Sequence, residues 1–350
     1  MLLSIITINY NNAVGLGKTL ASVASQTYPH IEHIIIDGGS SDNSVEVIRE
    51  YESSLASSPN SLIASHLKWI SEKDTGIYNA MNKGLEIALG RRIVNEDHTS
   101  CLIASSPHRL IASDHYIQIL NSGDILAAPD VTERMTAALE AQQAKGERLE
   151  AKSTMDEVKG EENDKSDTPA STPYTLHSTP TDASSPYQNY PAIFYGNMMK
   201  VNAAGQVVGK SGYTEYSLRQ FYSSTLNHDC AYIRKDLFEE YGLYDENLKI
   251  VSDWKWYLQA IGLGRVKPEY VDIDVTIFDD GGISETNLAL RNKERRQVLE
   301  ELLPPAVLWD YDTHAFEMEQ MNRLRRWKLY PLVYFMERVL FKLEKWGILG

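Results

Sequence analysis

The sequence predicts an α/β protein of the nucleotide-binding type, with a mostly parallel central sheet flanked by helices. Residues 2–8 form an apolar run rich in β-branched side chains, a turn follows at 9–12, and residues 17–26 have helical spacing. A second apolar run at 31–36 leads into a polar turn with two glycines and then a helical stretch at 44–51. Two such strand and helix units in succession favour a parallel, doubly wound sheet.

The same alternation continues along the chain. We expect a strand at 67–70, a polar turn at 71–76, a helix at 77–89 and a strand at 116–120 that leads into Asp124. Further strands are expected at 193–196, 231–233 and 270–278, with helices at 235–241 and from Asp253 onward. All of these elements lie within residues 1–300, which we predict to form one domain.

Two stretches interrupt this predicted domain. Residues 91–115 are longer than the connection of about 2 to 6 residues that usually links a helix to a strand, so we interpret them as an insertion. Residues 141–189 are rich in Glu, Lys, Ser, Thr, Pro and Asp and poor in bulky apolar side chains, a composition that cannot offset its own ordering entropy. We predict a disordered or poorly ordered surface loop there, with a linker between domains as the alternative.

Residues 301–350 are predicted to form a helical, basic and amphipathic C-terminal tail. Between residues 321 and 346, two acidic residues and several aromatic and leucine side chains are interleaved with seven basic residues: Arg323, Arg325, Arg326, Lys328, Arg338, Lys342 and Lys345. This pattern is typical of a helix in a membrane interface, and predicts a peripheral position on the inner face of the cytoplasmic membrane. The alternative is a helix packed on the domain or in a dimer contact.

Charge and cysteine content argue against several classes of protein. The net charge of −14 argues against a nucleic-acid binder, because neutralising phosphates needs a basic face. Cys101 and Cys230 have no spacing that suggests a disulfide scaffold or a zinc site, and they favour a reducing cytoplasm. No apolar window of about 18 residues predicts a transmembrane span, and residues 1–10 resemble a first strand more than a signal peptide. The Gly-Lys-Thr of residues 17–19 lacks the first glycine of a phosphate-binding loop, since position 12 is asparagine.

Four residues at expected strand or helix ends are candidates for chemistry on a sugar nucleotide. Asp37 lies at the sheet edge where such folds bind ligands and could accept from a pyrimidine N–H, or it could simply cap a turn. Asp124 could ligate Mg²⁺ or Mn²⁺, or form only a turn. Asp253 could be the base for an acceptor hydroxyl, or an N-cap. His228 could ligate a metal, line the acceptor pocket, or be a hydrogen-bonded structural histidine.

Several motifs occur in a specific order and spacing. They are Ser4-Ile-Ile-Thr7-Ile-Asn-Tyr10-Asn11, Ser25-Gln-Thr-Tyr28, His33-Ile-Ile-Ile-Asp37-Gly-Gly39-Ser-Ser-Asp42, Ser71-Glu-Lys-Asp74-Thr-Gly76-Ile-Tyr78-Asn-Ala-Met-Asn82-Lys83-Gly84, Leu120-Asn-Ser-Gly-Asp124, His228, Tyr244-Asp-Glu, Ser252-Asp253-Trp254 and Phe278-Asp-Asp-Gly-Gly-Ile-Ser284. The series resembles family 2 glycosyltransferases with the GT-A fold. The resemblance covers about residues 3–300, apart from the two insertions and residues 53–65.

The resemblance implies an inverting transfer of a hexosyl or N-acetylhexosaminyl group from a nucleoside-diphosphate sugar, expected to be a UDP-sugar. The acceptor would be a hydroxyl of a glycan or a lipid-linked molecule in polysaccharide biosynthesis. Asp253 would be the catalytic base, Asp124 would hold a divalent metal (Mn²⁺ or Mg²⁺), and His228 and Trp254 would lie on the acceptor side. The donor site implied in the same way comprises Thr7, Tyr10, Asn11, Asp37, Gly39, Asp74, Gly76, Asn82, Lys83 and Asn121.

Two positions depart from the family pattern. Gly38 replaces the second aspartate of the common Asp-Asp-Gly-Ser turn, and Gly123 replaces the first carboxylate of the metal-binding pair. Base recognition would then depend more heavily on Asp37, and the metal on fewer protein ligands.

Two other classes of function are alternatives to the transferase. A catalytically silent nucleotide-sugar-binding protein is one alternative, against which the retention of both Asp124 and Asp253 counts. A dinucleotide-dependent oxidoreductase is disfavoured, because the first turn reads Asn-Tyr-Asn-Asn rather than G-x-G-x-x-G. The transferase interpretation requires that Asp37, Asp124 and Asp253 lie around one cleft.

Overall fold

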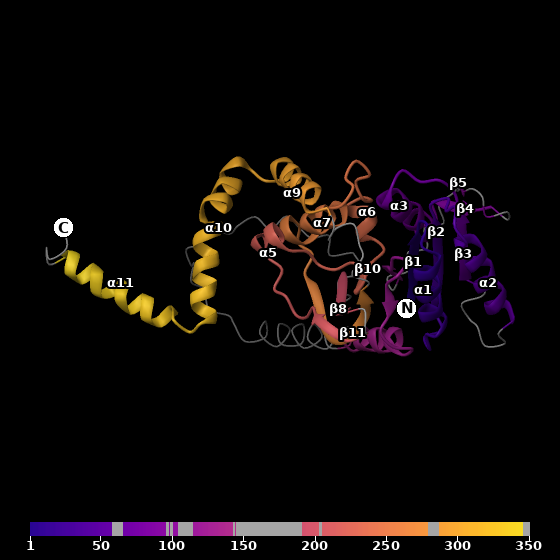
Figure 1. The fold of residues 1–350 in the computed structure, drawn as a ribbon, viewed down its shortest axis with the longest axis horizontal. Coiled ribbons are helices and arrows are strands. Elements are labelled where there is room, and N and C mark those ends of the chain that lie inside the picture. The colour runs from indigo at the N-terminus through magenta and orange to yellow at the C-terminus, as the bar shows by residue number, and fades with distance from the viewer. Residues whose placement is uncertain are drawn as a thin grey trace, which may run out of the picture. The chain divides into compact units, whose positions relative to one another are not determined.

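A computed structural model describes residues 1–57, 66–95, 98, 101–103, 115–142, 144, 191–202, 205–278 and 287–345 (Figure 1). The chain divides into two compact units, residues 1–291 and residues 292–350. Most of the predicted surface loop at 141–189 and residues 279–284 of the last motif lie outside the described residues.

The first unit is built on one sheet with the strand order β3-β2-β1-β6-β10-β8-β11-β7, and β9 pairs with β8. Its strands are β1 (Leu2–Asn9), β2 (Ile31–Asp37), β3 (Leu67–Ser71), β6 (His115–Ile119), β7 (Ile125–Leu126), β8 (Ile193–Val201), β9 (Val207–Lys210), β10 (Ala231–Arg234) and β11 (Pro268–Phe278). β3, β2, β1 and β6 run parallel, as do β8 and β11. β10, β7 and β9 are antiparallel to their neighbours. The predicted α/β class with a largely parallel sheet is confirmed.

Helices cover both faces of the parallel half, as Figure 1 shows. They are α1 (Ala13–Ala24), α2 (Ser44–Ser57) and α3 (Ile77–Ala88). Leu3 and Ile5 of β1 belong to the same buried cluster as apolar side chains of α1 and α2. Gly84 of α3 lies on the other face, where an added Cβ would be only 2.4 Å from Cγ2 of Ile6. The alternation of side chains along β1 therefore gives each face its own helices.

The remaining elements of the first unit complete the half that contains the acceptor-side candidates. They are a helix over residues 131–142, α5 (Leu218–Ser223), α6 (Leu237–Glu240), α7 (Ser252–Tyr257) with a π-helical continuation (Leu258–Leu263), and the start of α9 (Leu288–Leu302). Within the predicted insertion at 91–115, β4 (Arg92–Val94) and β5 (Cys101–Ile103) form a separate antiparallel pair. Residues 104–114 of that insertion lie outside the described part.

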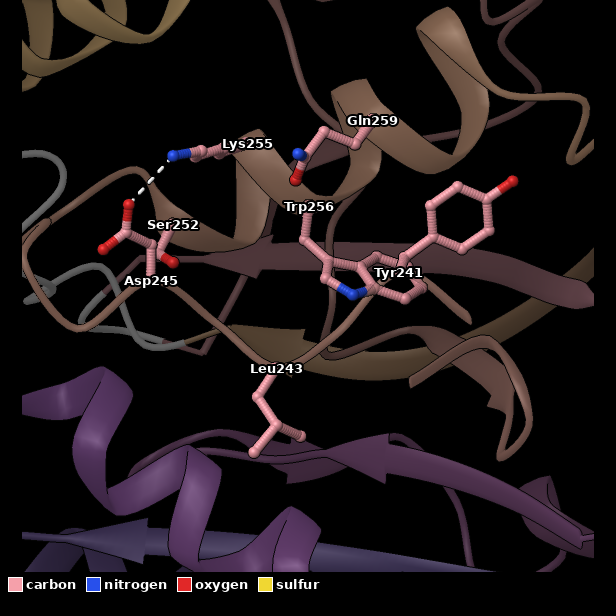
Figure 2. Close-up of a pocket in the computed structure, with 7 residues that line it drawn as sticks. All are labelled: Tyr241, Leu243, Asp245, Ser252, Lys255, Trp256 and Gln259. Atoms are coloured by element: carbon pink, nitrogen blue, oxygen red, sulfur yellow. Dashed lines mark hydrogen bonds and ion pairs between the residues drawn. The ribbon is translucent and has the colours of Figure 1, made fainter. Parts of the chain in front are cut away.

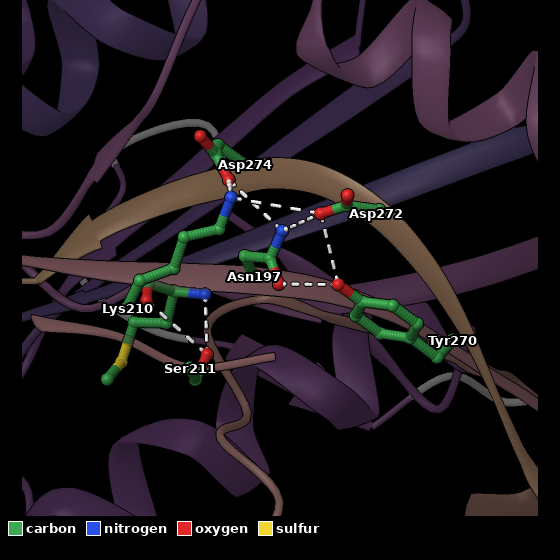
Figure 3. Close-up of polar contacts among 7 residues, drawn as sticks. Asn197, Lys210, Ser211, Tyr270, Asp272 and Asp274 are labelled. Carbon is green, nitrogen blue, oxygen red and sulfur yellow. Dashed lines mark hydrogen bonds and ion pairs between the residues drawn. The ribbon is translucent and has the colours of Figure 1, made fainter. Parts of the chain in front are cut away.

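A polar network joins β8, β9 and β11 where β11 departs from regular pairing (Figure 3). Asn197 of β8 is fully buried, and its amide donates to Asp272 and Asp274 of β11 at 2.9 and 3.1 Å. Lys210 of β9 pairs with Asp274 at 2.6 Å, and the Tyr270 hydroxyl donates to Asn197 at 2.9 Å. The irregular stretch of β11 is thus held by side chains, because its ladder is interrupted there.

The second unit consists of the rest of α9, α10 (Pro305–Arg326) and α11 (Tyr330–Lys345). The chain turns between α10 and α11, where Lys328 has a left-handed φ of 55°. Large apolar side chains of α11 are exposed, among them Leu332, Tyr334, Phe335, Leu340 and Phe341. Within the described residues, no helix is both long and apolar enough to cross a bilayer.

Candidate active site

Three parallel strands end level with one another at one edge of the sheet. The pairing register places Asn9 opposite Asp37, and Asp37 opposite Ser71. Because parallel strands present their carboxyl ends at the same edge, the loops that follow them meet there. The predicted position of Asp37 at this edge is what the structure shows.

The carboxylate of Asp37 is nevertheless turned into the protein. It is 0% exposed. Oδ1 accepts from Asn9 Nδ2 at 2.8 Å and from Ser40 Oγ at 2.6 Å, while Oδ2 accepts from Ser40 N at 3.0 Å and from Ser71 Oγ at 2.7 Å. Four donors fill the roughly four acceptor positions of a carboxylate. In this structure Asp37 therefore ties the loops together, and its role as acceptor for a base stays a prediction.

The loops after β1 and β2 are tied by a second set of bonds. Asn11 adopts a left-handed φ of 49°, its N–H donates to Ser40 Oγ at 2.8 Å, and its Oδ1 accepts from Ser41 N at 2.7 Å. Gly39 has a φ of 75°, which favours glycine at this turn. Tyr10 is 65% exposed at the same edge, so its ring is available for stacking.

Asp74 and Gly76 lie at the start of α3, beside the loop after β2. Gly76 N donates to Asp74 Oδ1 at 3.0 Å, and Gly76 precedes the helix with a φ of 140°. Burial raises the pKa of Asp74, and the neighbouring charge of Asp37 acts in the same direction, against the Gly76 N–H and Lys83. A carboxylate thus lies partly buried at this edge in addition to Asp37.

Three predicted donor-site residues have other partners. Thr7 is fully buried, 3.0 Å from Nε2 of the core residue His33, whose pKa burial lowers to about 3. The Lys83 ammonium pairs with Glu72 at 2.8 Å and also donates to a backbone carbonyl in the same turn, so its charge is already neutralised. Asn82 Nδ2 donates to the carbonyl of Tyr244 at 2.9 Å, and Oδ1 accepts from the N–H of Tyr244 at 3.0 Å. In the structure these residues hydrogen-bond or pair within the protein, and their assignment to the donor site stays a prediction.

Asp253 lies in the first turn of α7 between two hydrogen-bonding side chains. The Tyr78 hydroxyl of α3 donates to Oδ1 at 2.8 Å, and His228 Nδ1 lies 3.4 Å from Oδ2. Residues far apart in the sequence thus converge on one carboxylate. A carboxylate with one such side chain on each oxygen keeps capacity for a substrate hydroxyl, unlike Asp37.

The pKa values of this pair move in opposite directions. Burial alone would lower the pKa of His228, but the hydrogen bond to Asp253 and the charges of Asp253, Asp229 and Asp124 raise it to about 9. Burial alone would raise the pKa of Asp253, but the hydrogen bond and charge of His228 and the Tyr78 hydroxyl lower it. Near neutral pH the pair is therefore an imidazolium beside a carboxylate.

Asn121 and Asp124 lie on the loop after β6, and Asn121 contacts the pair. Asn121 Nδ2 lies 3.1 Å from His228 Nε2, and a half-turn of the amide would bring its oxygen to the imidazolium instead. The Asp124 residue is 3% exposed, and Thr19 of α1 donates to its carbonyl at 2.8 Å. The charge of Asp124 is one of those that raise the pKa of His228.

A divalent metal at Asp124 is compatible with the donor set, although the protein supplies little of it. Among the described residues, no group of three or more His, Cys, Asp or Glu side chains is arranged to hold a metal ion. Asp124 contributes a hard carboxylate oxygen, and Mg²⁺ commonly takes one or two carboxylates together with substrate phosphates. The residues present therefore fit a metal whose coordination the diphosphate completes.

One face of α7 and its π-helical continuation borders a small pocket of about 210 Å³ (Figure 2). Ser252, Lys255, Trp256 and Gln259 line it at helical spacing, and Lys255 pairs with Asp245 at 2.9 Å. This pair fastens the loop before α7 to the helix that positions Asp253.

Trp254 faces the core, where its indole N–H donates to the carbonyl of Phe221 at 2.8 Å and the residue is 1% exposed. Its ring is therefore packed within the protein, and its assignment to the acceptor side stays a prediction.

Sequence reasoning missed the supporting residues of the site. Tyr78 stands within the motif after Gly76, but only the fold shows that the first turn of α3 faces α7. Asn9, Ser40 and Ser71 also stood within quoted motifs or beside them. The signal available was that Asn9 and Ser71 stand at strand ends and Ser40 in the turn after a strand. That all three donate to Asp37 was not evident from the sequence.

Comparison with known proteins supports the resemblance drawn from the sequence. Residues 4–98 match the sequence model of glycosyl transferase family 2. An uncharacterized glycosyltransferase of Mycobacterium tuberculosis is 42% identical over 88 residues, 25% of this chain and 29% of that protein. A PGL/p-HBAD biosynthesis glycosyltransferase of Mycobacterium bovis is 33% identical over 87 residues, 25% of this chain and 31% of that protein. The chain thus spans about a third or less of the length of these relatives. The predicted family resemblance is confirmed.

Two solved structures have a partial likeness to this chain. TarS of S. aureus, residues 1–349 in complex with UDP-GlcNAc, has a TM-score of 0.49 and 16% identity over 82% of this chain and 61% of that one. The mannosyltransferase PcManGT of Pyrobaculum calidifontis, in complex with GDP-Man and Mn²⁺, has a TM-score of 0.45 and 13% identity over 85% of this chain and 63% of that one.

Proposed function

From the match of residues 4–98 to glycosyl transferase family 2, we propose that the protein is an inverting glycosyltransferase. Its donor would be a nucleoside-diphosphate sugar, expected to be a UDP-sugar. The observation that carries the proposal is the carboxylate of Asp253 between Tyr78 and His228. It is partly buried, charged near neutral pH and able to accept a further hydrogen bond. Those are the properties that a base for an acceptor hydroxyl needs.

In the proposed reaction, Asp253 takes the proton of the acceptor hydroxyl as its oxygen attacks the anomeric carbon. The bond from that carbon to the nucleoside diphosphate breaks on the opposite face, so the configuration inverts. Tyr78 and His228 are positioning residues, since each holds one oxygen of Asp253. Asp124 would hold a divalent metal, which when bound stabilises the charge of the departing diphosphate.

A test of the catalytic assignment replaces Asp253 with asparagine, which removes the proton acceptor and keeps the shape of the side chain. We expect transfer to fall by at least about a hundredfold while UDP binding changes little. Transfer would be followed with UDP-sugars and Mn²⁺, and UDP binding by calorimetry. Undiminished transfer in this variant would remove Asp253 as the base. Donor binding without transfer or hydrolysis in the wild-type protein would favour the silent nucleotide-sugar-binding alternative.

The acceptor is proposed to be a glycan or a lipid-linked molecule of polysaccharide biosynthesis at the cytoplasmic membrane face. What supports it is α11, where exposed apolar side chains such as Phe335 and Phe341 share one helix with Arg338, Lys342 and Lys345. Such a helix binds an interface by apolar burial and by attraction to anionic lipids.

Co-sedimentation of the full chain with vesicles of anionic phospholipid tests this attachment. We expect binding that weakens with salt and that is lost when Phe335 and Phe341 are both replaced by serine. The attachment would be contradicted if the protein sedimented equally with vesicles of neutral and of anionic lipid, or if it sedimented with neither.

A further inference from the structure

The space beside Gly38 is filled by the carboxylate of Asp74. A Cβ built on Gly38 would lie 2.3 Å from Asp74 Oδ2 and 3.3 Å from Tyr10 Cδ2. Real Cβ atoms do not approach an oxygen so closely, so any larger residue at position 38 would force Asp74 to move. The glycine at 38 and the aspartate at 74 are therefore complementary, and the space beside Gly38 is also bordered by the exposed ring of Tyr10.

Asp74 has acceptor capacity that Asp37 lacks. All four donors of the loop cluster converge on Asp37, whose residue is 0% exposed. Asp74 accepts one backbone N–H at Oδ1, and among the described residues Oδ2 receives no hydrogen bond. Its residue is only partly buried, so this oxygen can meet a ligand. The two carboxylates are neighbours, but only one offers an unused oxygen.

We propose that Asp74 Oδ2 accepts the ring N–H of the base of the donor nucleotide, while the Tyr10 ring stacks on the face of that base. This inference rests on the proposed function and names the group that selects the base. Uracil and guanine present a ring N–H next to a carbonyl, which a carboxylate can accept. Cytosine presents a lone pair at the corresponding ring nitrogen, which a carboxylate repels. Exposed aromatic rings stack with any base, so Tyr10 adds affinity while Asp74 adds selectivity.

The two residues can be tested separately by calorimetry with UDP, GDP and CDP as probes. We expect the wild-type chain to bind UDP or GDP about tenfold or more tightly than CDP, since a hydrogen bond to a charged group is at stake. Asp74→Asn should remove or invert that ratio, because an amide can donate to the ring nitrogen of cytosine. Asp130→Asn is the matched control, because Asp130 is an exposed carboxylate with a long 3.9 Å ion pair to Arg134. This control should keep the wild-type ratio.

Gly38→Ala supplies a second route to the same site. The added methyl group should displace Asp74 and weaken UDP or GDP by about tenfold. In the Asp74→Asn background it should cost less than in the wild-type chain, because the two changes act on one interaction. Circular dichroism would confirm that the variants are folded, and if Asp74→Asn is not, the methyl variant still decides the matter.

The outcomes separate this inference from the proposed function. Equal weakening of UDP, GDP and CDP by Asp74→Asn would show that Asp74 only supports the turn through Gly76, and the inference would fail alone. The inference would also fail alone if the wild-type chain bound UDP or GDP no more tightly than CDP. A wild-type chain that binds none of the three would overturn the proposed function together with the inference.

Discussion

The imidazole of His228 should keep its second proton up to about pH 9 in the wild-type chain and lose it much earlier in an Asp253→Asn variant. A rise from 6.5 to about 9 corresponds to roughly 3 kcal/mol in favour of the charged form. The burial of His228 opposes that charge, so the hydrogen bond and the surrounding carboxylates must outweigh it. With an amide at position 253 the largest of these contributions disappears, and we expect the pKa to fall toward 6.5 or below.

The same prediction has a thermodynamic form whose sign is fixed by linkage. Because the pKa of His228 is raised in the folded chain, its contribution to stability is fully present below pH 6.5 and is lost as pH rises through about 9. The pKa of Asp253 is lowered, so its contribution is present above 3.8 and is lost as pH falls below that value. We therefore expect the wild-type chain to lose up to roughly 3 kcal/mol relative to a His228→Gln variant between pH 6.5 and about 10.

Two measurements check this. Proton and carbon NMR of the histidine rings would follow titration, with the signal of His228 assigned from its absence in the His228→Gln variant. Urea unfolding at several pH values would give the free energy of unfolding for both chains. A His228 signal that titrates near 6.5 in the wild type, or that is indifferent to Asp253→Asn, would refute the charged pair.

Two further predictions concern neighbours of this pair. Tyr78→Phe removes a donor from Asp253 Oδ1, so the acid limb of the transfer rate should move to higher pH by about one unit, while UDP affinity, measured by calorimetry, stays nearly constant. An unmoved limb would mean that the hydroxyl does not tune the base. Asp124→Ala should abolish the dependence of donor binding on Mn²⁺, measured by titration with and without EDTA. If the wild type proves as indifferent to EDTA as the variant, Asp124 has no metal role.

Features of the fold that depend on residues close together in the sequence could be predicted, whereas those that depend on contacts between distant segments could not. The parallel strands of the first half were predictable, because each is an apolar run followed by a polar turn and an amphipathic helix. The antiparallel placement of β10 between β6 and β8 was not, because it depends on pairing between segments far apart in the chain. The strand residues themselves were identified, but a short apolar run does not state its direction.

In the site, too, the positions of residues could be predicted from the sequence, but their hydrogen-bond and ion-pair partners could not. The sequence placed Asp37 at a strand end, Asp253 at a helix start and Asp74 in the turn before a helix, and each of them lies there. It could not show that Asp37 is saturated by four donors, since those come from the ends of β1 and β3 and from the loop after β2. Nor could it show that Lys83 is neutralised by Glu72, because the pairing depends on how the turn before α3 folds back.

The two glycines that depart from the family pattern have different physical explanations. Gly38 has an ordinary φ, and a side chain at this position is excluded only by the carboxylate of Asp74. The lack of a side chain at position 38 therefore makes room for the carboxylate of Asp74. Gly123 has a φ of 110°, which strains any other residue, and its N–H donates to Thr19. An aspartate at 123 would therefore require a different backbone in the loop that carries Asp124. At position 38 the carboxylate of the family pattern is absent, but that of Asp74 occupies the space. At position 123 the carboxylate is absent without a replacement, so the diphosphate would have to complete any metal site at Asp124.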